Sequence, residues 1–289
     1  MNNYSLVSLQ KRKKSTDNFV QKVGKSLWHY TSFPALDGIL RRNEIWFGSA
    51  TNVNDSTEVT GFIDNLKQNI YSDIEQNNIS PLYDVDDIFN QIYARTAQKH
   101  LFMFCLSQAL EDAAQWDRYA DYGRGVALEF NTEALHNLLF YHGVIIGEQY
   151  YTQETKEHEL YKLLSSYITN GILEDFSDLN GFIDNLALCG LIHKHPSFAS
   201  EKEVRISPYF VKDGDSHIEY KIFNTIKEVY VLDLTILFGQ ENMGVEDIIN
   251  SIIIGPRSLQ SPKDLENYCR HLGFNKLAEN IKISDCPLR

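Results

Sequence analysis

The segment 100–108, HLFMFCLSQ, constrains the fold of this chain more than any other stretch. An apolar run of this length without alternation is typical of a strand that is buried on both faces. Such a strand needs strands beside it and further layers above and below it. Other strand-like segments supply the neighbours: 27–30, 44–50, 125–131, 142–151, 203–210, 228–234, 251–256 and one within 276–285. We therefore expect residues 100–108 to lie in the centre of a large sheet.

The segments between these strands do not follow a regular βαβ alternation, which favours an α+β fold. Helical patterns occupy residues 33–43, 112–123 and 261–274, and longer ones occur near 57–100 and 153–194. Since no Pro/Gly/Ser-rich linker divides the chain, we expect a polar and basic segment at 1–24, followed by one domain at 25–289 with helical insertions near 57–100 and 153–194. The hexapeptide GFIDNL occurs at 61–66 and again at 181–186, and it predicts two similar amphipathic helix starts.

The charge of the chain limits its partners. Its 289 residues carry a net charge of −12, which disfavours broad binding to nucleic acid or to an anionic membrane, because both are polyanions. The basic run Lys11–Lys14 fits a solvated flexible arm, or else a docking arm for nucleic acid.

The cysteines and histidines predict neither a disulfide framework nor a metal centre. The four cysteines are far apart and form no CxxC pair. With no apolar leader and no stretch of about 18 apolar residues, they indicate a cytoplasmic protein with reduced thiols. His193 and His195 could chelate a metal, but no third ligand has a convincing spacing, so we expect no metal.

Two polar groups lie on or beside the first strand-like segments. His29 and Thr31 are two residues apart, so both project from one face of a strand, as a ribose or phosphate site requires. His29 could equally be a hydrogen-bonded core residue. Asn54 and Asp55 follow the second strand, where they either contribute to a site or form a turn and a helix cap.

Two more groups combine aromatic or charged side chains. In WDRYADYGRG, Trp116, Tyr119 and the nearby arginines could stack on a planar ring and hold an anion, or form an ordinary amphipathic helix. In EKEVRI, Glu201, Glu203 and Arg205 share one face of a strand. That face is either a site or an exposed charged sheet surface.

In order, these pieces resemble the bacterial domain-of-unknown-function family 2971 (DUF2971). The resemblance covers roughly residues 27–275. Val204 stands where the family usually has an aromatic residue, and Tyr122–Gly125 departs from its usual pattern. The matching segments are LWHYTSFPALDGILRRNEIWFGSATNVNDSTE, FCLSQALEDAAQWDRYADYGRGVALEF, EKEVRI and IIIGPRS.

The segment WHYTSFPALDGILRRNEIWF is also similar, more distantly, to the first strand and helix of ADP-ribosyltransferases of the DNA-targeting toxin type. This resemblance implies a split, curved mixed sheet and NAD as the substrate. It implies that His29 holds a ribose, that Tyr119 or Trp116 stacks on nicotinamide, and that Glu203 acts on the nicotinamide ribose. The remaining NAD-binding residues that we expect are Tyr30, Thr31, Asn54, Asp55, Ser107 and Arg205.

The chemistry of such an enzyme explains these residue types. Cleavage of the nicotinamide–ribose bond creates an oxocarbenium-like cation, which a preorganised carboxylate stabilises. His29 and Thr31 would fix a ribose, and an arginine would meet the pyrophosphate. We expect Glu203→Gln to lower the rate by a factor of about 10²–10³ with little effect on folding, because a pocket face is partly hydrated. If Glu203 instead pairs with Arg205 or with a cation of a neighbouring strand, the same change should lower stability.

The resemblance implies a role in bacterial defence or as a toxin effector, and the acceptor is open among protein, DNA, RNA and small molecules. The alternatives are a non-catalytic module that binds a nucleotide or a protein, and a metal-dependent hydrolase or nuclease that uses His193 and His195.

Overall fold

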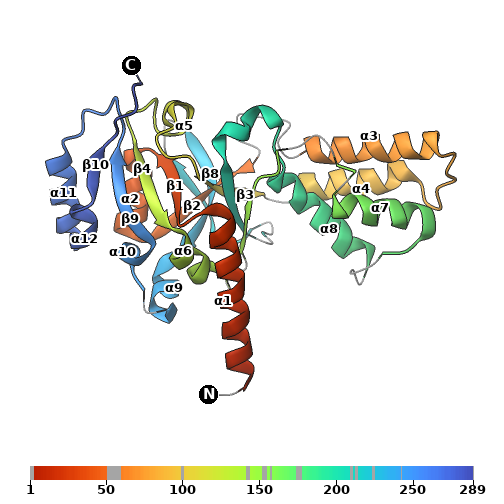
Figure 1. Ribbon diagram of the computed structural model, residues 1–289, viewed down its shortest axis with the longest axis horizontal. Helices are drawn as coiled ribbons and strands as arrows, with labels where there is room; N and C mark the ends of the chain where they lie inside the picture. Colours follow the sequence, from red (N-terminus) through yellow and green to blue (C-terminus); the bar gives the residue numbers. More distant parts are fainter. Residues whose placement is uncertain are drawn as a thin grey trace.

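The computed structural model of the chain is a mixed α/β protein, with a curved, open, mixed sheet and helices around it (Figure 1). Among the residues that it describes, no helix combines the length and the apolar character needed to cross a bilayer. The structure describes residues 3–50, 60–98, 101–140, 144–151, 155–156, 158–173, 178–208, 211, 214–222, 225–241 and 243–288.

Eight strands follow the order β10-β9-β4-β1-β3-β2-β8-β7, while β6 pairs with both β3 and β5. The β9–β10 pair is parallel, and the other strand pairs of the described residues are antiparallel. The strands are β1 (Ser26–Thr31), β2 (Glu44–Ser49), β3 (Phe102–Ser107), β4 (Val126–Asn131), β5 (Val144–Glu148), β6 (Glu203–Pro208), β7 (Ile218–Ile222), β8 (Ile226–Asp233), β9 (Ile249–Ile254) and β10 (Ile281–Ile283). The central position expected for this apolar run is confirmed for residues 102–107, because β3 has three strand neighbours.

The sheet divides along β3. Near one end of β3, Ser107 pairs with Trp28 of β1, and near the other end Met103 pairs with Gly48 of β2. Between these two pairings, the carbonyl oxygen of Cys105 lies 2.8 Å from Nδ1 of His29. The His29 side chain therefore satisfies a backbone carbonyl where β1 and β2 separate.

The main core covers one face of the sheet. Along β3 and β6 the apolar residues Phe104, Leu106, Val204 and Ile206 all belong to this core. Because β-strand side chains alternate, the residues between them project from the opposite face. Helices that contribute to the core include α2 (Phe33–Arg42), α6 (Thr132–Leu139), α9 (Leu234–Glu241), α10 (Val245–Ile248), α11 (Pro262–His271) and α12 (Asn275–Ala278).

Helix α2 illustrates how local sequence produces these elements. Pro34 lies in its first turn, where the missing N–H is not needed, and Asn43 ends the helix in a left-handed conformation. Leu36, Ile39 and Leu40 are buried on one face. The helix expected at 33–43 is confirmed.

The helices at 61–98 and 159–189 pack together as a separate helical lobe, beside the sheet in Figure 1. Its members are α3 (Gly61–Gln76), α4 (Val85–Gln98), α7 (Glu159–Asn170) and α8 (Leu179–Cys189). Both GFIDNL segments start helices in this lobe. Phe62, Ile63 and Leu66 share its core with Phe182, Ile183 and Leu186. The prediction of two similar amphipathic helix starts is therefore confirmed.

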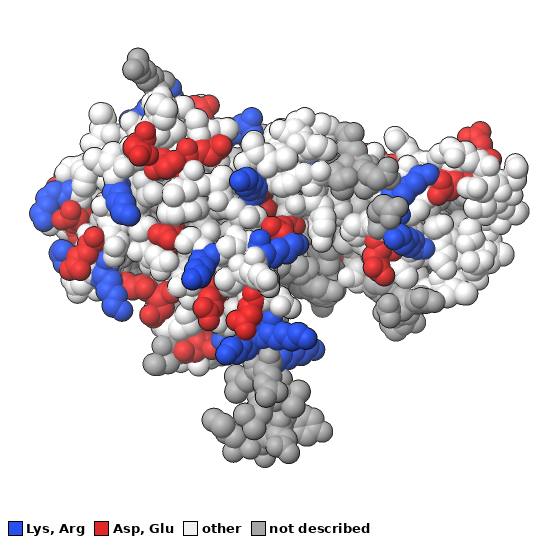
Figure 2. Space-filling view, in the orientation of Figure 1, with Lys and Arg blue, Asp and Glu red and all other residues white. Residues whose placement is uncertain are grey.

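The basic run near the N-terminus lies in helix α1 (Asn3–Val23), which projects from the sheet lobe. The two guanidinium NH groups of Arg12 donate to Glu241 at 3.1 and 2.8 Å, and its Nε donates to Asn137 at 3.2 Å. The expectation of a flexible arm is therefore wrong at Arg12, because these bonds attach α1 to the domain. Figure 2 shows basic side chains gathered where α1 leaves the sheet lobe, with acidic ones beside them.

Two glycines bring the GRG and IGP segments into close backbone contact. The amide of Gly255 donates to the carbonyl of Gly125 at 2.8 Å. A Cβ atom at Gly125 would lie 2.1 Å from the carbonyl oxygen of Thr31, and one at Gly255 would lie 2.4 Å from that of Gly123. Both contacts are with backbone, which cannot move away as a flexible side chain could.

We expect Gly125→Ala to lower the free energy of unfolding by about 1–3 kcal/mol, because the added methyl group forces β1 and β4 apart. Chemical denaturation monitored by circular dichroism measures the loss. Gly239→Ala is the matched control, since it lies in helix α9 with no atom within 4 Å of the new Cβ. It should be neutral or stabilising. Equal stability of Gly125→Ala and wild type would show that the contact relaxes without cost.

Candidate active site

Strand β6 carries Glu203 and Arg205 of the EKEVRI segment, and every residue of the strand is buried. Glu203 pairs with Ser107 of β3, and Arg205 pairs with Cys105. Paired residues project from the same face, so Glu203 and Arg205 lie opposite the main core. The expectation of a shared strand face is confirmed for Glu203 and Arg205 and is wrong for Glu201, because the strand begins only at Glu203. An exposed charged sheet surface, the alternative reading, is wrong because both side chains are enclosed.

Glu201 reaches the same face from a different element. It ends the short 3₁₀ helix η3 (Pro196–Glu201), and Lys202 then turns the chain into β6 with a φ of 43°. The Ser107 hydroxyl donates to the Glu201 carbonyl at 2.5 Å and accepts from the Ala109 amide at 2.9 Å. Ser107 therefore holds the η3–β6 turn against the end of β3.

The carboxylates are joined to cations in one buried network. Lys194 Nζ lies 2.6 Å from Glu201 Oε2 and 2.8 Å from Glu203 Oε2. Arg205 Nε donates to Glu203 Oε1 at 2.7 Å, and its two NH groups donate to Glu203 Oε2 and to the carbonyl of Leu191. Both oxygens of Glu203 are thus occupied by cationic partners, with side-chain exposures of 7% or less for all three residues.

This environment sets the charge state of Glu203. Burial alone would raise its pKa, but the charge and hydrogen bonds of Arg205, together with the charge of Lys194, outweigh burial and lower the pKa to about 2. Glu203 is ionised at neutral pH. The amide of Glu203 also donates to the hydroxyl of Tyr151 at 2.6 Å, which fixes the start of the strand.

The network reaches solvent through the two partners of Glu201 Oε1, although Glu201 itself is buried. Arg118 of α5 (Ala113–Tyr119) donates to this oxygen at 2.8 Å, and the Tyr119 hydroxyl donates to it at 3.1 Å. The Arg118 side chain is 45% exposed, and its guanidinium lies 5.6 Å from the centre of the Phe198 ring. Burial raises the pKa of the Tyr119 hydroxyl, which keeps it a proton donor. We call Arg118, Tyr119, Lys194, Glu201, Glu203 and Arg205 the Glu201–Glu203 cluster.

The cluster contains three cations and two carboxylates, so it carries a net charge of +1. Its exposed end presents an arginine, a tyrosine and the ring of Phe198 around a carboxylate oxygen. Such an end can bind an anion through Arg118 and a planar ring through the aromatic side chains.

His29 and Thr31 lie on the other face of the sheet. The imidazole of His29 stacks on Phe104 of the main core, with ring centres 4.1 Å apart. Burial lowers the pKa of His29 to about 4, although the hydrogen bond to Cys105 acts in the opposite direction. The structure therefore does not bring His29 together with Tyr119 and Glu203. The register β1–β4 places Thr31 beside Val126, which belongs to the same core.

Tyr30 and Trp116 lie on the same side of the sheet as the cluster but pack in a small core of their own. Their rings meet edge to face, with centres 5.0 Å apart. The hydroxyl of Tyr30 donates to the carbonyl of Ala109, and the indole N–H of Trp116 donates to Glu111. Since Trp116 is fully buried, it cannot stack on a ligand in this conformation. Asn54 and Asp55 lie outside the described residues.

Lys194 is the cluster residue to which the sequence assigned no role, whereas Arg118 is one of the arginines near Tyr119 that the sequence marked as able to hold an anion. Lys194 lies between the two histidines considered for metal binding. His193 is buried and stacks on Phe62 at 3.6 Å, whereas His195 is exposed and accepts from the Ser197 amide. The two side chains thus have different environments. The sequence could have predicted Lys194 only indirectly. Two buried carboxylates require nearby cations, but the spacing of residues in the sequence does not identify which lysine or arginine supplies them.

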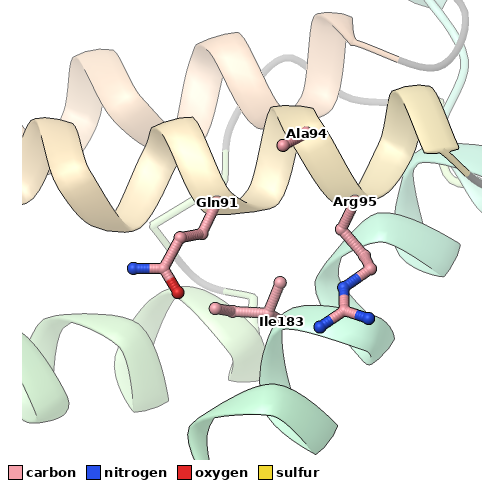
Figure 3. Close-up of a pocket in the computed structure, with 4 residues that line it drawn as sticks. All are labelled: Gln91, Ala94, Arg95 and Ile183. Carbon is pink, nitrogen blue, oxygen red and sulfur yellow. The ribbon is translucent and has the colours of Figure 1, made fainter.

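A surface pocket of about 230 Å³ lies in the helical lobe rather than at the cluster. Gln91 and Arg95 extend from α4 toward it on either side of Ile183 of α8, as Figure 3 shows. The guanidinium of Arg95 lies 3.4 Å from Asp184, so its charge is already partnered.

Comparison with known proteins gives one result for this chain. The model of a protein family of unknown function, DUF2971, matches residues 115–206. That stretch begins in α5 and ends in β6, so it contains all six residues of the cluster. Searches of curated proteins and of solved structures each found no significant match. The match supports the resemblance of this segment to DUF2971.

Proposed function

We propose that this chain binds NAD at the exposed end of the Glu201–Glu203 cluster and cleaves the nicotinamide–ribose bond, as ADP-ribosyltransferases do. The observation that carries the proposal is the convergence on Glu201 Oε1 of a half-exposed arginine and a tyrosine. NAD offers an anionic pyrophosphate for Arg118 and a flat nicotinamide for Tyr119 or Phe198. The division of the sheet along β3 is the feature of the fold that supports an ADP-ribosyltransferase-like assignment.

Glu201, rather than Glu203, is the carboxylate assigned to the reaction. Both oxygens of Glu203 are held by buried cations, so its charge is neutralised within the protein. One oxygen of Glu201 instead faces Arg118 and Tyr119, which reach the surface. When Arg118 turns to the pyrophosphate, this oxygen becomes available to the nicotinamide ribose.

The reaction balances without a further reagent. The C–N bond breaks, its electron pair neutralises the pyridinium nitrogen, and nicotinamide leaves. Glu201 stabilises the oxocarbenium-like ribose. A nucleophile, either water or a hydroxyl, carboxylate or amine of an acceptor, then forms the new bond at the same carbon and loses its proton.

We expect Glu201→Gln to lower the rate of nicotinamide release by a factor of about 10²–10³, the usual effect of losing one preorganised electrostatic group. NAD labelled in its adenylate phosphate is incubated with the protein and with protein, DNA and RNA acceptors. Nicotinamide release and transferred label are both measured. The surface variant Glu266→Gln is the control. Wild-type protein that releases no nicotinamide and transfers no label would contradict the proposal.

Two substitutions of Tyr119 separate its ring from its hydroxyl. Tyr119→Phe keeps the ring and removes the bond to Glu201, whereas Tyr119→Ala removes both. If the ring stacks on nicotinamide, only Tyr119→Ala should raise KM strongly. Unfolding measured on the same preparations shows whether any loss follows stability instead.

A second candidate is a non-catalytic module that binds a nucleotide. It is favoured by the ion pairs of both carboxylates, which are complete without a ligand. Calorimetry with NAD distinguishes the two: heat of binding without nicotinamide release supports the module.

A further inference from the structure

Strand β7 is the last strand in the sheet order, and no strand within the described ranges pairs with its outer edge. The amide of Val231 donates to the carbonyl of His217 at 2.7 Å. This bond shows which backbone groups of β7 point toward β8. In an antiparallel pair, residues alternate between facing the partner strand and facing away. Since His217 faces β8, the backbone groups of Tyr220 and Ile222 face away from it. The edge therefore offers unpaired donors and acceptors.

On one face of the β7–β8 hairpin, the side chains near this edge are apolar and exposed. Tyr220, Ile222 and Ile226 are 69%, 80% and 71% exposed. Ile222 pairs directly with Ile226, so both project from the face that Tyr220 occupies two residues earlier. Further along the same face, Ile218 and Tyr230 pack against the main core. The end of the β7–β8 hairpin therefore leaves an apolar face that the main core does not cover. Natural edge strands usually avoid exposing such a face.

The sequence of β7 is complementary to itself in the antiparallel direction. It reads Ile-Glu-Tyr-Lys-Ile from Ile218 to Ile222. A twofold axis at Tyr220 places each Ile218 opposite Ile222 of a second copy. It also places each Glu219 opposite Lys221 of that copy, so that no like charges face each other. Within each copy Lys221 already pairs with its own Glu219 and with Glu44. A strand of another protein would match this pattern only if its own sequence had the same alternation. A second copy of this chain always has it.

We propose that β7 is a dimer interface, at which two copies of this chain join their sheets edge to edge around a twofold axis at Tyr220. The outward groups of Tyr220 and Ile222 then bond to the second strand, and the exposed isoleucines pack against the other copy. This interface is isologous, so it closes at two copies and leaves no free edge at β7.

The first test is the mass in solution. Sedimentation equilibrium of the full chain should give twice the protomer mass of 33.3 kDa at high concentration. Ile222→Lys should raise the dissociation constant by about tenfold or more, because it places a charge in the apolar contact. Ile283→Lys is the matched control, since Ile283 is 61% exposed on β10, at the opposite end of the sheet. A wild-type chain that stays monomeric across the accessible concentrations overturns the proposal.

The second test checks the register and does not depend on a loss of folding. Mild oxidation should join Tyr220→Cys to itself, since residues paired across the axis lie at a Cα separation that a disulfide spans. Glu219→Cys should not join to itself, because its neighbour across the axis is Lys221. The four native cysteines are partly or fully buried, so background crosslinking is low. Equal crosslinking of both variants would mean random collision and would overturn the twofold arrangement.

Discussion

Glu203→Gln should lower the free energy of unfolding by about 3–5 kcal/mol, the usual cost of removing one partner from a buried ion pair. The substitution removes the charge that both Lys194 and Arg205 contact within 2.8 Å. Two buried cations would then share the single remaining carboxylate of Glu201. This differs from the expectation drawn from sequence, in which a hydrated pocket face made the change harmless to folding.

Urea denaturation at neutral pH measures this loss. Glu266→Gln is the control, because its partner Lys263 is exposed and such pairs contribute about 1 kcal/mol or less. Adding Lys194→Met to Glu203→Gln removes one of the unpaired cations, so the double variant should recover part of the loss. Stability equal to wild type in Glu203→Gln, together with lost activity, would return the catalytic role to Glu203.

Mild acid should destabilise the protein through two buried histidines. Burial lowers the pKa of His29 and of His193 to about 4, from 6.5 in an exposed chain. Between these values the unfolded chain binds protons that the folded chain does not. Stability is therefore fully present above pH 6.5 and is lost as the pH falls toward 4. We expect each histidine to cost about 2 kcal/mol by pH 5.

The two histidines have separate environments, which allows separate tests. His29 lies at the division of the sheet, whereas His193 is stacked between Phe62 and Tyr150 beside the helical lobe. His29→Asn keeps a donor near Cys105, and His193→Gln removes the second titrating ring. Each variant should reduce the fall in stability between pH 7 and pH 5 by about 2 kcal/mol. His195→Gln, an exposed neighbour, should leave the profile unchanged, and a flat profile in wild type would contradict the prediction.

Several features of the fold follow from the sequence because local patterns are sufficient to determine them. The apolar run at 100–108 is a central strand, and Pro34 and Asn43 bound the helix between them. Alternation in EVRI correctly places Glu203 and Arg205 on one face and Val204 and Ile206 on the other. Strand β7 was not predicted from the sequence. Its segment IEYKI alternates bulky and charged residues over only five positions, which is too short a pattern to indicate a strand.

The composition of the candidate site depends on pairings that no local pattern records. Trp28 and His29 are adjacent in sequence, yet β1 sends them to opposite faces. The register in which β1 pairs with β3 and β4 turns the His29 side chain toward the main core. Glu203 projects from the opposite face, so the two side chains are not neighbours. In the same way, Lys194 and Arg118 join Glu201 from elements that lie 7 and 83 residues away in the chain. The sequence alone thus determined most of the strands and helices, and which residues within β6 share a face. Only the tertiary structure decided which faces meet, and hence that Glu203 is enclosed by buried cations while Glu201 bonds to Arg118 and Tyr119, which reach the surface. The reason is that burial and ion pairing arise only when distant elements pack.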